Sequence, residues 1–66
     1  MLSLPEIRAL QFVKNSGGYA TKENFIDDHE PVGEWLWRDL AGYIEVNYDG
    51  KIFLTKAGHD ALSEKG

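Results

Sequence analysis

The stretch that most constrains the fold is residues 41–58, AGYIEVNYDGKIFLTKAG. Gly42 suits the end of a helix, because glycine readily adopts the left-handed conformation that a helix cap needs. The next residues alternate between apolar and polar up to Asp49-Gly50, a dipeptide typical of hairpin turns. After a second alternating run, Thr55 offers a hydroxyl that can begin another helix. The stretch therefore predicts a helix end, a β-hairpin and a helix start.

The register of this hairpin follows from its apolar residues. A two-residue loop at Asp49-Gly50 would mix apolar and polar side chains on both faces. A three-residue loop that begins at Tyr48 separates them, because a slip of one residue moves every side chain to the other face. This loop needs a left-handed residue, which Gly50 supplies. The side chains predicted to share the buried face are Ile44, Val46, Ile52 and Leu54.

This stretch is similar to the wing of winged-helix proteins, and most similar to that of the MarR-like regulators. In the resemblance, Gly42, Tyr43 and Ile44 end the recognition helix, and the segment from Leu54 to Gly58 ends the wing. It covers nearly the whole chain and implies an α+β winged helix-turn-helix, with three helices, a hairpin and a fourth helix. Winged helices read DNA, read RNA or dock proteins, so the resemblance specifies a fold better than a function.

The remaining helices can be placed from caps and spacing. We expect helices over residues 3–15, 21–29, 31–41 and 56–64, with Pro31 in the first turn of the third. The predicted centre of the core consists of Leu10, Ile26, Leu36, Leu40 and Leu54. With 66 residues, the chain is expected to form one domain spanning 1–66.

Composition and motifs narrow the function classes. The chain has no cysteine, which suits a reducing, cytoplasmic compartment. It begins MLSLPEIRAL, without the basic start or long apolar run of a signal peptide or membrane span. No nucleophile elbow, phosphate loop or metal-ligand spacing occurs, so we expect no enzymatic activity and no cofactor. The run from Asp27 to Glu30 suits either a divalent cation or a solvated helix end and turn.

The formal net charge of −4 is concentrated in the predicted helix-turn-helix. Residues 21–43 contain two basic and six acidic residues, which accounts for the whole excess. Carboxylates that face phosphates repel them without the gain from counterion release, so this charge opposes DNA binding. An acidic surface instead attracts basic partners.

The third helix carries the candidate binding residues. Helical spacing predicts that Val32, Trp35, Leu36, Leu40 and Tyr43 face the core. The side chains predicted to face outward are Gly33, Glu34, Trp37, Arg38 and Ala41. An outward tryptophan suggests an anchor in a protein interface. The alternative is a rotated helix, with Trp37 in the core and Trp35 outside.

Three residues of the hairpin complete the candidate binding set. Lys51 lies at the predicted wing tip, where it could contact phosphate. Tyr48 and Phe53 lie on the outer wing, where they either extend an apolar binding patch or shield the hairpin backbone.

Two functions are consistent with these observations. The first is a small non-enzymatic regulator or adaptor that contacts a protein, or a second copy of itself, through the third helix and the wing. The second is a sequence-specific DNA-binding regulator, in which Arg38 and Lys51 are contacts. Neither requires a membrane or a small-molecule cofactor.

Overall fold

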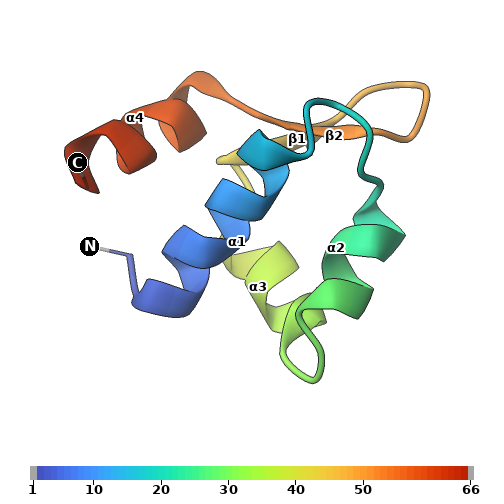
Figure 1. Ribbon diagram of the computed structural model, residues 1–66, viewed down its shortest axis with the longest axis horizontal. Coiled ribbons are helices and arrows are strands. Elements are labelled where there is room, and N and C mark those ends of the chain that lie inside the picture. Colours follow the sequence, from blue (N-terminus) through green and yellow to red (C-terminus); the bar gives the residue numbers. More distant parts are fainter. Residues whose placement is uncertain (1, 66) are drawn as a thin grey trace.

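The computed structural model describes the backbone of residues 2–65 and the side chains of residues 2–63. Its elements, in chain order, are α1 (Leu4–Asn15), α2 (Lys22–Asp28), α3 (Gly33–Asp39), β1 (Ile44–Val46), β2 (Ile52–Leu54) and α4 (Lys56–Lys65). This order is that of an α+β winged-helix arrangement, as predicted. In Figure 1, α1 crosses the middle of the molecule, with α2 and α3 on one side and α4 on the other.

Side-chain caps begin three of the helices, as their sequences predict. Ser3 Oγ accepts a hydrogen bond from the Glu6 backbone N–H at 3.4 Å, and the Glu6 carboxylate accepts one from the Ser3 N–H at 2.8 Å. Thr21 and Asn24 form the same reciprocal pair at the start of α2. Thr55 Oγ1 accepts from the Gly58 N–H at 3.2 Å and begins α4. These bonds satisfy donors that the first turn of a helix leaves unpaired.

The hairpin has the predicted register. Val46 pairs with Ile52, Ile44 pairs with Leu54, and Gly50 has a φ of 85° in the loop between the strands. Glycine adopts this left-handed backbone without the steric cost that a side chain would bring. The three-residue loop is therefore confirmed.

One expectation for the hairpin, the burial of Val46, is wrong. Ile44, Ile52 and Leu54 are buried, whereas Val46 is 47% exposed. The reason is its place in the sheet: β2 has a second neighbour, because the Ile52 N–H donates to the Ala20 carbonyl at 2.9 Å. β2 therefore lies between β1 and the link before α2, and it is β2 that packs against α1. β1 is left as an edge, and Val46 at its end is not covered as Ile52 is.

The core lies between α1, the inner faces of α2 and α3, and the hairpin. Four of the five residues predicted at its centre are buried, namely Leu10, Leu36, Leu40 and Leu54. Ile26 is only partly buried and packs against the edge of the core. Its neighbour Phe25 takes the inward position on the short α2 and is fully buried.

The third helix begins later than predicted. It spans Gly33–Asp39, so Pro31 precedes the helix rather than lying in its first turn. The Val32 N–H donates to the His29 carbonyl at 3.0 Å, which closes a turn between α2 and α3. The helix starts only after this turn, and Val32 provides no side-chain cap.

Candidate functional site

The orientation of α3 differs from the predicted one and decides which residues are free to bind. Trp37 was predicted to face outward, but its side chain is half-buried and packs against the core. Trp35 was predicted to face inward, but it is 72% exposed. Gly33, predicted outward, is buried, and Val32, predicted inward, is exposed. The helix is thus turned by less than one residue step of about 100° from the predicted orientation.

An aromatic cluster holds Trp37 in place. The Trp37 ring lies edge-on to Phe25, with 5.5 Å between the ring centroids. Phe25 also contacts Phe12 of α1, at 6.2 Å, and His29, at 4.7 Å. On α2, the Lys22 Nζ lies 5.5 Å from the Trp37 centroid. This cluster joins α1, α2 and α3, and it gives Trp37 more contact than an outward orientation would.

His29 also belongs to this cluster. Its Nδ1 lies 2.7 Å from the Phe25 carbonyl oxygen. Because a carbonyl oxygen only accepts hydrogen bonds, the Nδ1 carries the proton. The imidazole also lies 5.2 Å from the Phe12 ring, nearly perpendicular to it. His29 therefore ends α2 and supports the packing of α1 on α2.

Close approach of two backbones also sets the orientation of α3. A Cβ atom added at Gly33 would clash with the carbonyl oxygen of Ile26. Only glycine allows α3 to begin this close to α2. The contact directs the Gly33 side of the helix inward, and the opposite side therefore faces solvent.

The outward face of α3 combines one large apolar side chain with charges. Trp35 and Arg38 lie one turn apart, and both are exposed. Glu34 and Asp39, one on each side of them, are exposed as well. We call these four residues the α3 face. Of the six residues predicted to bind, it includes Glu34 and Arg38.

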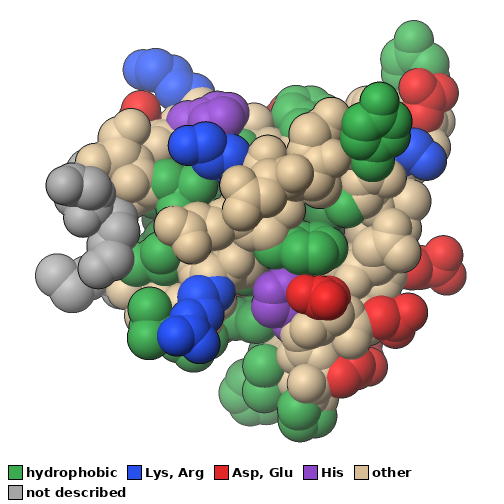
Figure 2. Space-filling view, in the orientation of Figure 1, with side chains coloured by type: hydrophobic (Ala, Val, Ile, Leu, Met, Phe, Trp, Pro, Cys, Tyr) green, Lys and Arg blue, Asp and Glu red, His purple; other side chains and the backbone are tan. Residues whose placement is uncertain are grey.

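Exposed acidic residues also gather on α2, the helix before the α3 face in the chain. Four exposed carboxylates lie on α2 and in the turn that follows: Glu23, Asp27, Asp28 and Glu30. Figure 2 shows acidic side chains along the lower right of the molecule, with hydrophobic side chains gathered below. Lys22 is the single basic residue of α2, and its ammonium group lies over the Trp37 ring. The acidic surface predicted from the sequence is therefore present.

The three hairpin residues of the predicted set form a separate patch. Tyr48 is fully exposed in the turn, and Phe53 is partly exposed on the outer face of β2. Lys51 is half-buried, because its backbone forms a bridge with Thr21. In Figure 1 the hairpin turn lies at the upper right, whereas α3 lies below the middle. The wing therefore does not extend the α3 face into one continuous apolar patch.

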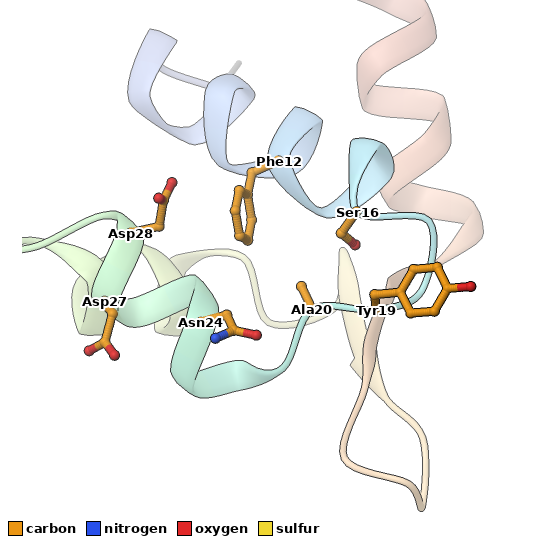
Figure 3. Close-up of a pocket in the computed structure, with 7 residues that line it drawn as sticks. All are labelled: Phe12, Ser16, Tyr19, Ala20, Asn24, Asp27 and Asp28. Carbon is orange, nitrogen blue, oxygen red and sulfur yellow. The ribbon is translucent and has the colours of Figure 1, made fainter.

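A hollow opens between the end of α1 and α2. Its volume is about 540 Å³, and its lining is partly aromatic and partly polar. The lining residues, drawn in Figure 3, are Phe12, Ser16, Tyr19, Ala20, Asn24, Asp27 and Asp28. The Phe12 ring hangs from α1 toward α2, with Asp28 on one side of it and Ser16 on the other. Asp27 and Tyr19 point away from its middle.

The described residues offer no metal site. Across residues 2–63, no three His, Cys, Asp or Glu side chains come together as ligands of an ion. The run from Asp27 to Glu30 is split, since its carboxylates are exposed while His29 is engaged in the aromatic cluster. Of the helices that the structure describes, none has the length and apolar character needed to cross a membrane.

Trp35 is the exposed aromatic residue of α3 that the predicted set omitted. The sequence did contain a signal for it, because Gly33, Leu36, Trp37 and Leu40 follow the i, i+3, i+4, i+7 spacing of an inward helix face. That pattern leaves Trp35 outside. The competing pattern, built on Val32 and Trp35, is apolar too, and sequence spacing alone does not choose between them.

The chain matches no protein-family model, no curated protein and no solved structure. The resemblance to MarR-like regulators therefore stays a prediction.

Proposed function

We propose that this protein is a small non-enzymatic regulator or adaptor that binds a protein partner through the α3 face. The observation that supports this proposal best is Trp35, which is 72% exposed on the outer side of a short helix. Leaving so large an aromatic side chain in water forgoes the gain from burying it. Tryptophan is also among the residues most enriched at the centres of protein interfaces.

Charge favours a protein partner over nucleic acid. Glu34 and Asp39 lie on the α3 face itself, and α2 adds further exposed carboxylates. A helix that approaches a phosphate backbone with these groups would be repelled, because nucleic-acid affinity comes largely from cations that neutralise phosphates. A partner with basic residues around an apolar pocket fits the same surface. We therefore expect the partner to present such a pocket to Trp35.

One observation supports DNA binding as a second candidate. Arg38 is exposed one turn after Trp35, in the part of the fold that enters the major groove in helix-turn-helix proteins. An arginine there can bond to a guanine edge or a phosphate. In this alternative, Arg38 reads the groove and Lys51 of the wing contacts the backbone.

The proposal extends to the cellular setting and to self-association. A cytoplasmic location suits a chain without cysteine. A second copy of the chain is one form that the partner could take, and Tyr48 and Phe53 on the wing would then be available as a second contact.

A DNA titration separates the two candidates. The purified protein is titrated with random-sequence duplex DNA at about 20 mM and about 150 mM salt. The adaptor proposal predicts no binding even at low salt, because few cations are present to release counterions. Tight binding that weakens steeply with salt and is abolished by Arg38→Ala would support the DNA candidate and contradict the adaptor.

Affinity capture tests the α3 face directly. Wild-type protein, Trp35→Ala and Leu4→Ala are used as bait in extract of the source cells. Leu4 is a matched control, since it is an exposed apolar residue on α1, outside the α3 face. A captured protein is then purified, and its affinity for each bait is measured. We expect Trp35→Ala to weaken binding by about 2 kcal/mol, on the order of 30-fold, and Leu4→Ala to leave it unchanged.

The capture experiment has two contradicting outcomes. Equal affinity for wild type and Trp35→Ala would show that Trp35 is not an anchor. Equal loss in both variants would show that binding depends on general surface hydrophobicity and not on the α3 face.

A further inference from the structure

The hollow between α1 and α2 is a second feature of the acidic side that the proposed function does not use. One wall is the Phe12 ring, which is half-buried and held by its contacts with Phe25 and His29. The opposite wall is α2, which brings the Asn24 side chain and the Asp28 carboxylate to the edge of the hollow (Figure 3). The hollow thus combines an aromatic surface with a carboxylate.

We infer that this hollow receives the guanidinium group of an arginine side chain that belongs to the protein partner. The inference rests on the proposed function, because it names the chemistry by which that partner is recognised. The guanidinium would lie against the Phe12 ring, and its N–H groups would donate to the Asp28 carboxylate.

The aromatic wall favours this occupant. A cation next to an aromatic face is attracted by the negative charge density of the ring, and arginine forms this contact more often than lysine. A guanidinium is also planar and weakly hydrated, so it can stack on a ring and bond to a carboxylate at the same time. The hollow, about 540 Å³ in volume, also has room for the aliphatic part of the side chain.

The position of the carboxylates favours a cation as well. Asp27 and Asp28 are the last two residues of α2, and the last turn of this helix contains no basic residue. The C-terminal end of a helix carries partial negative charge, so carboxylates there are unfavourable and a cation is favourable. Lys22, the single cation of α2, lies instead at the first turn, over Trp37. An arriving guanidinium would therefore relieve a repulsion that the free protein retains.

The test uses N-acetyl-arginine amide as the probe and N-acetyl-citrulline amide as its neutral counterpart of the same shape. Each is titrated into the ¹⁵N-labelled protein, and backbone amide shifts are followed by NMR. We expect the arginine probe to shift Ser16, Ala20, Asn24 and Asp28, and the citrulline probe to shift them much less. Raising the salt concentration should weaken the arginine effect, as for any exposed ion pair.

Two charge variants make the test specific. Asp28→Asn should weaken arginine binding about fivefold, the upper end for an exposed ion pair. Glu23→Gln makes the same charge change on the first turn of α2, outside the lining of the hollow, and should leave binding nearly unchanged. Phe12→Leu should also weaken binding, and a spectrum that keeps its dispersion would show that this variant is still folded.

Three outcomes would overturn the inference. The first is that the citrulline probe shifts the backbone amides as much as the arginine probe does. The second is that Asp28→Asn and Glu23→Gln weaken binding of the arginine probe equally. The third is that the arginine probe shifts the amides of all acidic residues to the same extent.

A Trp35→Ala variant distinguishes a failure of this inference from a failure of the proposed function. Trp35 does not line the hollow, so Trp35→Ala should bind the arginine probe normally. If the probe does not bind but Trp35→Ala still loses the captured partner, only the arginine site is wrong. If the probe binds as expected but Trp35→Ala keeps the partner, the α3 face is wrong.

Discussion

The two faces of α3 present the same residue type in opposite roles. Trp37 packs on Phe25 within a cluster that joins three helices, whereas Trp35, two residues away, is largely exposed among carboxylates. The difference does not come from the tryptophans, which are chemically identical. It comes from the orientation of the helix, which is set by the close approach of Gly33 to the backbone of Ile26. The comparison teaches that one seven-residue helix can pack through one side and leave the other exposed. If the proposed function is right, mutations on the two sides should separate stability from binding.

The largest effect is expected deep on the inward face. Leu40 is fully buried, so Leu40→Ala should lower the free energy of unfolding by about 2–5 kcal/mol. In a domain of this size such a loss is a large part of the total, and many molecules would unfold. Urea denaturation followed by circular dichroism measures it. An unchanged urea midpoint would mean that α3 does not pack as described.

The tryptophan pair comes next. Trp37→Ala should cost about 2 kcal/mol, less than the 3–5 kcal/mol of a fully buried aromatic residue, because part of the ring is exposed. Trp35→Ala, the matched change on the outward face, should stay within about 0.5 kcal/mol of wild type. The comparison is again made by urea denaturation. An equal loss of unfolding free energy in the two variants would contradict the statement that only Trp37 packs against the core.

Gly33→Ala tests whether the close approach of Gly33 to Ile26 sets the orientation of α3. The added methyl group would meet the backbone of Ile26, which cannot move aside without shifting α2. We expect a loss of about 1–3 kcal/mol, as for other overpacked sites. Gly18→Ala is an informative control, because a Cβ there has no neighbour within 4 Å and only its φ of 90° opposes the change. The backbone amide chemical shifts of α2 and α3 should differ from wild type in Gly33→Ala and match wild type in Gly18→Ala.

The smallest effect concerns the end of α2. Asp28→Asn removes a negative charge from the negative end of the helix and should stabilise the free protein by about 0.3–1 kcal/mol. Glu23→Gln, at the positive end, should destabilise it by a similar amount. Thermal unfolding at low salt measures both. If Glu23→Gln stabilised the protein while Asp28→Asn left its stability unchanged, the helix dipole would not account for the effect of these two charges.

The hairpin and the caps were predictable because the interactions that decide them are local. Register depends on residues within one short stretch, and Gly50 supplies its turn without help from the rest of the chain. The caps are local as well, because each capping side chain accepts a hydrogen bond from the residue three positions later in the chain. The capping residues are Ser3, Thr21 and Thr55. The exposure of Val46 was not predictable in this way, because it depends on β2 pairing with Ala20, an unrelated part of the chain.

The candidate site was predictable in its charge and in the outward positions of Glu34 and Arg38, but not in its tryptophan. Six acidic residues in one stretch are visible in the sequence and remain exposed in the structure. The orientation of α3 depends on where Ile26 and Phe25 lie when the helices pack, and two apolar patterns compete for the inward side. The hollow arises where α1 and α2 meet, so no single segment predicts it.

Acrylamide quenching of single-tryptophan variants tests most directly which tryptophan is free to bind. Trp37→Phe leaves only Trp35 as the emitter, and Trp35→Phe leaves only Trp37. Acrylamide is uncharged, so the acidic surface does not bias its access. We predict that Trp35 is quenched nearly as strongly as a free indole and Trp37 several times less. Weaker quenching of Trp35 than of Trp37 would contradict the assignment of binding to the α3 face.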